Sequence, residues 1–190
     1  MSSLSRLDLA FCIDLTSSMS SFIQAARQRM ESILDELQKP LGEGLRVAVV
    51  GYHDHCDPQL LDIAGFERSI PAIRKTLNGL KVNGGGDGPE AVYSGLHACL
   101  ELPWKPGAYR VVVLVGDAPP HACGGNGDSY PKQDPSGYNL DEMANTLETE
   151  GVFVHALAMM HGSDQVLEQS FRRLSVSTGG SYSDAKDASG

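Results

Sequence analysis

The sequence has no cluster of basic residues and no long hydrophobic stretch. Only 15 lysine and arginine residues stand against 24 aspartate and glutamate residues, and the net charge is −9. Surfaces that bind nucleic acid or an anionic membrane need concentrated positive charge, so we expect neither partner. No stretch approaches the roughly 20 apolar residues of a membrane-spanning helix. The negative charge fits a cationic partner, or a metal ion that lies between the protein and its partner.

A signal-peptide core is also missing from the N-terminus, because Asp8 and Asp14 flank the only apolar run there. Cysteine is scarce, with four residues in 190. Two of them, Cys56 and Cys123, fall in predicted loops, but a disulfide between them is disfavoured in a reducing compartment. We therefore predict a cytoplasmic protein.

The 190 residues suit a single domain that covers the whole chain, 1–190. Strands are predicted at residues 7–14, 45–52, 60–66, 110–115, 152–159 and 180–183. Helices are predicted at residues 18–37, 69–80, 90–102, 140–149 and 165–174. This alternation predicts an α/β fold, with a doubly wound, mostly parallel sheet and helices on both faces. The third strand follows the second too closely for a crossover, and we expect it to be antiparallel.

The boundaries of the first helix follow from its spacing and from its flanking residues. Apolar residues recur at helical spacing over residues 18–37. Ser18 or Ser20 is the expected N-cap, and Pro40 together with Gly42 is expected to end the helix.

Three acidic residues lie in loops that the predicted sheet could bring together. Asp14 and Asp117 each follow an apolar strand at its carboxyl end, and Asp87 lies in a glycine-rich loop. In open α/β sheets, ligands bind outside the carboxyl ends of the strands. Thr16 and Ser18 follow Asp14 at alternate positions, and oxygen ligands of this kind suit Mg²⁺, Mn²⁺ or Ca²⁺. Any one of the carboxylates could instead be a turn or helix-cap residue.

All three loops resemble those of the von Willebrand factor type A domain. The segments that carry the resemblance are residues 14–20 (DLTSSMS), 84–91 (GGGDGPEA) and 115–121 (VGDAPPH). The second and third are most similar to the branch found beside alpha-type protein kinases and in bacterial stand-alone members. The resemblance implies a Rossmann-like sheet of six strands in the order 3-2-1-4-5-6, with strand 3 antiparallel.

The function implied by the resemblance is metal-dependent binding of a protein partner at a metal-ion-dependent adhesion site. Thr16 and Ser18 match its hydroxyl ligands, and Asp14 and Asp117 match carboxylates that hold the metal, often through water. One coordination position stays open for an acidic or neutral oxygen of the partner. Mg²⁺, or else Mn²⁺ or Ca²⁺, is the expected ion, and we expect a monomer that is not an enzyme.

The sequence departs from the family pattern in two places. Asp87 stands where a threonine is common, and as a third carboxylate ligand it should tighten metal binding and weaken the attraction for an acidic partner. Asp87 could instead point away and accept backbone N–H groups in its own turn. The second departure is an amphipathic helix after the last strand, which is expected to be missing because the sequence stops near its start. The chain could therefore be a fragment of a longer protein.

A zinc site and two classes of enzyme are disfavoured. A second set of donors could hold zinc but lacks a recognised pair spacing. Its members are His53, His55, Cys56, Asp57, His121 and Cys123. The last two lie in a long loop, 118–138, which is expected to be functional or mobile. An aspartyl phosphatase needs an acid where Thr16 stands, and a dinucleotide site needs a glycine where Pro89 stands. A structural or regulatory part of a larger protein, with a vestigial metal site, remains the alternative function.

Overall fold

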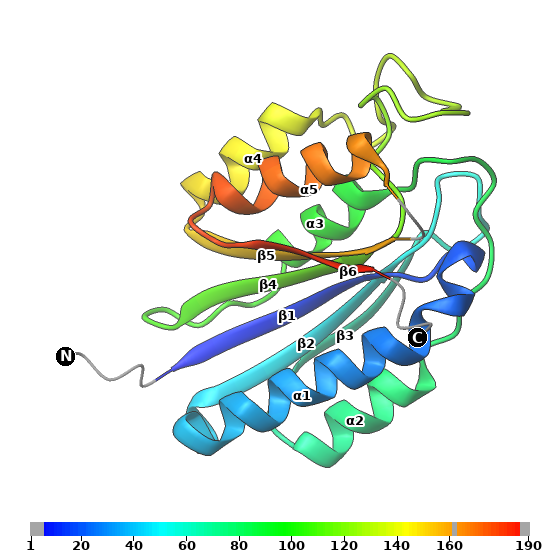
Figure 1. The fold of residues 1–190 in the computed structure, drawn as a ribbon. Coiled ribbons are helices and arrows are strands. Elements are labelled where there is room, and N and C mark those ends of the chain that lie inside the picture. Colours follow the sequence, from blue (N-terminus) through cyan, green and yellow to red (C-terminus); the bar gives the residue numbers. More distant parts are fainter. Residues whose placement is uncertain (1–5, 161–162, 187–190) are drawn as a thin grey trace.

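A computed structural model describes residues 6–160 and 163–186 of the chain. Six strands form one sheet in the order β3-β2-β1-β4-β5-β6, as predicted (Figure 1). All neighbouring strands are parallel except β2 and β3, which are antiparallel. The strands are β1 (Leu7–Asp14), β2 (Leu45–Tyr52), β3 (Leu61–Glu67), β4 (Tyr109–Gly116), β5 (Val152–Met160) and β6 (Tyr182–Lys186).

Helices lie on both faces of the sheet. Two of them, α1 and α2, pack on one face, and α3, α4 and α5 pack on the other (Figure 1). Their bounds are α1 (Ile23–Leu41), α2 (Ile70–Gly79), α3 (Val92–Leu100), α4 (Leu140–Thr149) and α5 (Gln165–Val176), with short 3₁₀ turns η1 (Ser17–Ser21) and η2 (Gly42–Gly44). No helix within the described ranges is both long and apolar enough to cross a bilayer.

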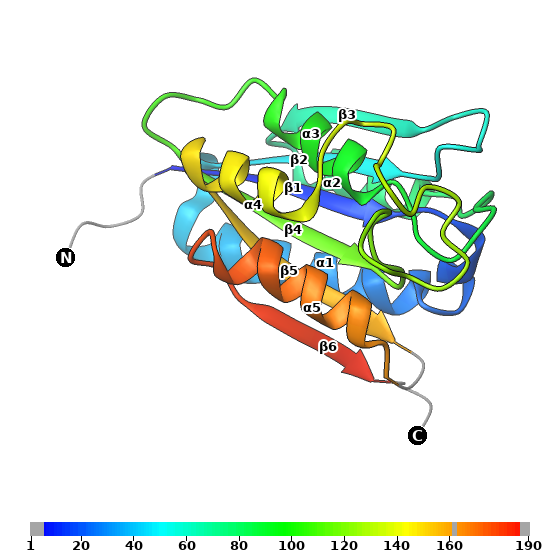
Figure 2. The ribbon, with the colours of Figure 1, turned by 90° about the horizontal axis from the view of Figure 1, so that it is seen from above.

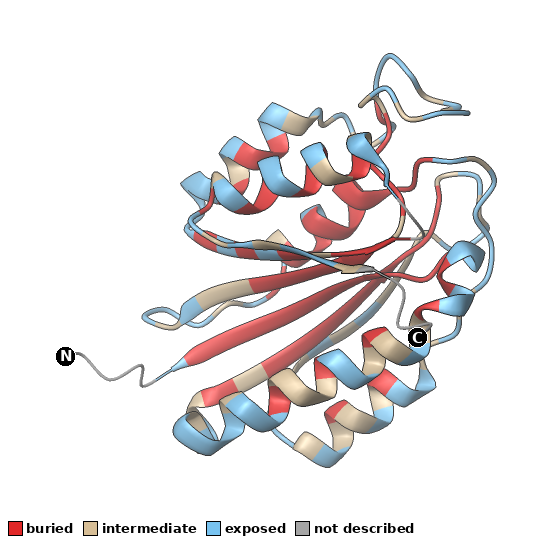
Figure 3. Cartoon of the chain, in the orientation of Figure 1, coloured by how far each residue is buried: buried red, intermediate tan, exposed pale blue. Residues whose placement is uncertain are grey.

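The sheet separates two apolar cores. Every residue of β1 is buried, because alternate side chains of a central strand point to opposite faces. Phe11 and Ile13 join the core under α1 and α2, whereas Ala10 and Cys12 join the core under α3, α4 and α5. Figure 3 shows the buried strands between helices whose outward faces are exposed. The central strands are therefore held rigidly, and so are the residues at their carboxyl ends.

The first helix begins later than predicted. Residues 17–21 form the 3₁₀ turn η1, and neither Ser18 nor Ser20 is the N-cap of α1, which is Phe22. Met19 is fully buried and fixes this turn against the core. The predicted end was also too early, because Pro40 lies inside the last turn of α1. The helix ends where Gly42 adopts a φ of 49°, a value that glycine tolerates without strain.

The C-terminal part of the sheet is also shifted relative to the prediction. The last strand starts at Tyr182 and extends to Lys186, rather than spanning residues 180–183. Gly180 precedes this strand and approaches β5 so closely that a Cβ atom there would lie 1.8 Å from the carbonyl oxygen of Val154. Residues 187–190, near which the absent C-terminal helix was expected to begin, lie outside the described residues.

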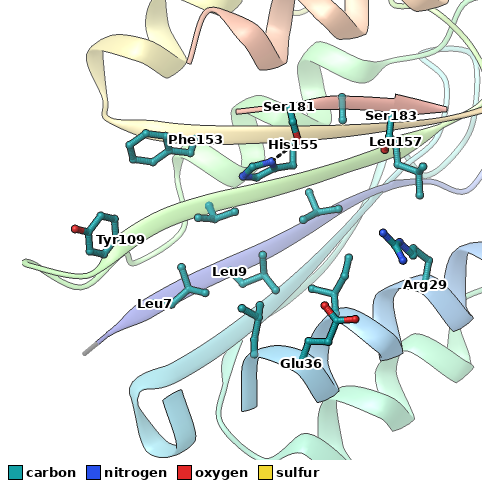
Figure 4. Close-up of a pocket in the computed structure, with 15 residues that line it drawn as sticks. Leu7, Leu9, Arg29, Glu36, Tyr109, Phe153, His155, Leu157, Ser181 and Ser183 are labelled. Atoms are coloured by element: carbon teal, nitrogen blue, oxygen red, sulfur yellow. Dashed lines mark hydrogen bonds between the residues drawn. The ribbon is translucent and has the colours of Figure 1, made fainter. Parts of the chain in front are cut away.

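One part of the sheet carries an open apolar groove. A cavity of about 620 Å³ lies between α1 and the strands β1, β4, β5 and β6 (Figure 4). Tyr109 and Phe153 line it and are 49% and 39% exposed. The groove lies on the α1 face of the sheet and is separate from the loops described next.

Candidate metal centre

The loops that carry the predicted site gather at the carboxyl ends of the parallel strands. Figure 2 shows them together at the end of the sheet towards which β4 points. Strands β1 and β4 are direct neighbours, with Ile13 paired to Val115. The residues that follow these strands are therefore side by side, as the sequence predicted for Asp14 and Asp117. The segment 84–90 is tied to the loop after β4 by a hydrogen bond from the Glu90 N–H to the Pro119 carbonyl (3.0 Å).

Four of the five predicted metal ligands form one continuous chain of hydrogen bonds. Asp14 Oδ1 accepts hydrogen bonds from the Thr16 N–H (2.8 Å) and from Thr16 Oγ1 (2.7 Å). Thr16 Oγ1 lies 3.1 Å from Ser18 Oγ, which donates to Asp117 Oδ1 at 2.9 Å. The first two residues are fully buried and Ser18 is exposed, so the chain runs from the core to solvent. The side-chain oxygens converge from two strand ends without any nitrogen or sulfur donor.

The charge of Asp14 is poorly compensated. Its side chain is fully buried, and Oδ2 has no hydrogen-bond partner among the described residues. Burial raises the pKa of Asp14 to about 7, and the negative charge of Asp117 adds to the rise, although the hydrogen bonds from Thr16 oppose it. A buried carboxylate oxygen without a partner is costly, and a divalent cation would compensate it. The residues present therefore fit a cation.

Asp87, the fifth predicted ligand, makes its contacts elsewhere. Its Oδ2 accepts the Ser129 N–H at 2.7 Å, from the loop 118–138. No described hydrogen bond joins it to Asp14 or Thr16. Asp87 does accept a backbone N–H, as in the alternative considered for it, but the donor belongs to a distant loop and not to its own turn. Without Asp87, the hydrogen-bonded cluster contains two carboxylates.

Glu90 is a site residue that sequence reasoning missed. It is 3% exposed, and its Oε2 has no hydrogen-bond partner among the described residues. A Cβ atom on Gly85 would lie 3.0 Å from Glu90 Oε1 and 3.1 Å from Thr16 Cβ, so Glu90 reaches the Thr16 side of the cluster. Burial raises the pKa of Glu90 to about 10, and the charge of Asp14 adds to this. In the sequence, a glutamate after Gly-Pro resembles an ordinary first-turn helix residue, so its position alone does not mark it as a site residue.

A second polar cluster surrounds His121, which is fully buried. Its Nε2 lies 2.8 Å from Asp54 Oδ1, and its Nδ1 lies 2.8 Å from Asp128 Oδ1. Burial alone would lower the pKa of His121, but the hydrogen bonds to these two carboxylates raise it to about 9. Potential ligand atoms of Asp54, Asp87 and His121 all lie within 4.8 Å of one another.

Three of the other zinc donors considered in the sequence have partners outside this group. His53 lies between Asp62 and the Asn83 carbonyl, His55 contacts Asp134, and Cys123 contacts the Tyr93 hydroxyl. Only His121 of that set lies in the group of possible metal ligands found among the described residues. Two contacts, between His55 and Asp134 and between His121 and Asp54, also hold the loop 118–138 against the loop that follows β2.

Comparisons with known proteins agree with this architecture. A family model described as the von Willebrand factor A domain matches residues 8–122. The alpha-protein kinase vwkA of Dictyostelium discoideum is 30% identical over 146 residues, which are 72% of this chain and 23% of the kinase. The chain therefore spans less than a quarter of that relative.

Two solved structures share the fold. The pilus adhesin SpaC of Lactobacillus rhamnosus GG superposes with a TM-score of 0.71 at 17% identity, over 97% of this chain and 28% of the adhesin. A von Willebrand factor type A protein of Catenulispora acidiphila gives a TM-score of 0.67 at 17% identity, over 96% of this chain and 39% of that one. At this level of identity the likeness supports the fold alone.

Proposed function

This chain belongs to the von Willebrand factor A domain family, and we propose that it binds a protein partner through a divalent cation at the rim of its sheet. Domains of this family serve in protein interaction and adhesion and are generally not enzymes. The proposed cation ligands are the side-chain oxygens of Asp14, Thr16, Ser18 and Asp117. We propose no catalytic role for them.

The observation that carries this proposal is the buried Oδ2 of Asp14, which has no partner among the described residues. It belongs to the same carboxylate whose other oxygen starts the hydrogen-bonded chain to Ser18 and Asp117. If Asp14 were only a structural cap, burying this oxygen would cost desolvation free energy, and no interaction would compensate that cost. A cation held by this carboxylate removes the cost.

The donor set selects the kind of cation. Carboxylate and hydroxyl oxygens without nitrogen or sulfur suit hard ions such as Mg²⁺, Mn²⁺ or Ca²⁺. Thr16 and Ser18 are neutral ligands, so they leave part of the cation charge uncompensated. The exposed side of the site at Ser18 gives an incoming ligand access to the metal.

The position of Asp87 bears on the chemistry of the partner. A third carboxylate at the metal would have disfavoured an acidic partner, but Asp87 contacts Ser129 instead. With two carboxylate ligands, Asp14 and Asp117, instead of three, the site repels an acidic oxygen less than it would with Asp87 at the metal. We therefore propose that the partner supplies an acidic oxygen, from an aspartate or glutamate side chain, to the open coordination position.

Metal addition tests the proposal directly. At a Mg²⁺ concentration about one hundred times the dissociation constant, binding contributes about 2.7 kcal/mol. For a domain of this size, that raises the melting temperature by roughly 5–10 °C relative to EDTA. Asp117→Asn should abolish the rise, whereas Asp141→Asn, on the exposed surface of α4, should keep it. An aspartate-bearing peptide should bind in Mg²⁺ and not in EDTA.

The same experiment can reject the proposal. If millimolar Mg²⁺, Mn²⁺ and Ca²⁺ all leave the melting temperature unchanged, the proposal of metal-dependent partner binding is wrong. The chain would then be a structural or regulatory part of a larger protein with a vestigial site.

A further inference from the structure

A second group of ligands lies beside the proposed cation site and is not used by it. It is built from three loops: Asp54 follows β2, Asp87 lies in the glycine loop, and His121 follows β4. Their potential ligand atoms all lie within 4.8 Å of one another. Backbone contacts hold the loops in this arrangement, including the bridge between Glu90 and Pro120. The group is therefore placed by the same scaffold as the first site, with different side chains.

Negative charge is in excess around this group. Three carboxylates, from Asp54, Asp87 and Asp128, surround a single imidazole, which can supply one positive charge at most. Asp87 Oδ1 is buried and has no hydrogen-bond partner among the described residues. Glu90, which is 3% exposed, adds a further unpaired oxygen, and the charges of Asp54 and Asp87 both act on it. The unpaired oxygens indicate that a cation completes the cluster.

The imidazole of His121 has the orientation of a metal ligand. Its Nδ1 is held by Asp128 at 2.8 Å, and Asp128 Oδ2 in turn accepts the Ala122 N–H at 2.8 Å. Metal-binding histidines commonly use one ring nitrogen for such a carboxylate, which fixes the ring and leaves the other nitrogen for the metal. Here the other nitrogen, Nε2, faces Asp54 Oδ1. An ion at this point would replace the proton between His121 and Asp54.

The donor types differ from those of the first site. An imidazole nitrogen joins two carboxylates, and the Cys56 Sγ lies 3.0 Å from Asp54 Oδ2. An imidazole nitrogen among the ligands favours Zn²⁺ and related ions over Mg²⁺ or Ca²⁺. We propose that Asp54, Asp87 and His121 form a second cation site, selective for Zn²⁺-like ions, beside the oxygen-only site at Asp14.

Titration calorimetry of the whole chain with Zn²⁺, in the presence of saturating Mg²⁺, tests this inference. We expect one Zn²⁺ to bind without displacing Mg²⁺. Asp87→Asn keeps an oxygen acceptor for the Ser129 N–H but removes the unpaired anionic oxygen, so it should weaken Zn²⁺ binding roughly tenfold or more. Its Mg²⁺ affinity should stay unchanged. His121→Gln should also lose Zn²⁺, and circular dichroism would check that it remains folded.

A matched control separates this site from surface histidines that bind Zn²⁺ weakly. His155 is exposed on β5, where its Nδ1 contacts Ser181, and His155→Gln should bind Zn²⁺ like the wild type. Bound Co²⁺ supplies an independent readout, because its visible absorption should disappear in Asp87→Asn and persist in Asp117→Asn.

The outcomes of this titration distinguish the second site from the first. The proposal of a second site is wrong if Zn²⁺ competes with Mg²⁺ for a single site, or if Asp87→Asn binds Zn²⁺ as tightly as the wild type. His121 would then be only an ion-pair partner of Asp54 and Asp128. If Zn²⁺ binds in the predicted way but Mg²⁺ does not bind at all, the second site holds and the proposed function fails.

Discussion

Replacement of Asp14 by asparagine should make the metal-free protein more stable. The side chain is fully buried, and Oδ1 already accepts two hydrogen bonds from Thr16. Asparagine keeps that oxygen and removes the charge. Its amide nitrogen takes the place of the unpaired Oδ2, close to Asp117, which can accept a hydrogen bond.

The size of the gain follows from the pKa of Asp14, which burial raises from 3.8 to about 7. Between these values the folded protein retains a proton that the unfolded chain releases, so the metal-free stability falls as pH rises through this window and is constant above it. At about 1.4 kcal/mol for each pH unit, the loss is on the order of 4 kcal/mol. Asparagine does not titrate, so Asp14→Asn should exceed the wild type by up to this amount at pH 8. At pH 5 the gain should be smaller by about 3 kcal/mol.

Urea unfolding in EDTA at pH 5 and pH 8 measures both differences. Mg²⁺ should stabilise the wild type and leave the stability of Asp14→Asn unchanged. This comparison separates the effect of removing the buried charge from the effect of metal binding. The exposed control Asp141→Asn should show neither effect. The reasoning is refuted if Asp14→Asn is less stable than the wild type at pH 8 in EDTA, or if the difference is the same at both pH values.

Two further predictions concern the scaffold. Asp8→Ala should lower the free energy of unfolding, measured in urea, by about 3–5 kcal/mol. Asp8 is 1% exposed, and its loss leaves the Arg46 guanidinium without the carboxylate that binds it at two points. A loss below about 1 kcal/mol would contradict this account. Gly180→Ala should lower the melting temperature by at least several degrees, because the new Cβ would collide with the backbone of Val154. Gly65→Ala places its Cβ in open space and should change the melting temperature little. Equal effects of the two variants would show that the collision is relieved without cost.

The positions of Asp14 and Asp117 could be predicted because each follows an apolar strand of clear pattern. Parallel strands place their carboxyl ends at one rim, and the strand order implied by the family resemblance makes these two strands neighbours, which brings the residues together. The start of α1 could not be predicted in this way, because helical spacing continues through residues 17–21 while the buried Met19 holds them in a 3₁₀ turn. Sequence periodicity does not separate these two helix types.

The sequence by itself determined the α/β fold and the antiparallel third strand, because these depend on periodic patterns and on connection length. The strand order that brings Asp14 near Asp117 came from the family resemblance of the three loops. Only the tertiary structure decided that Asp87 accepts the Ser129 N–H and lies near His121. It also decided that Glu90 lies on the Thr16 side of the proposed cation site. The physical reason is that the glycine loop has no periodic pattern of its own. Its path is set by hydrogen bonds to distant segments, such as those from the Asn83 N–H to the Leu15 carbonyl and from the Glu90 N–H to the Pro119 carbonyl.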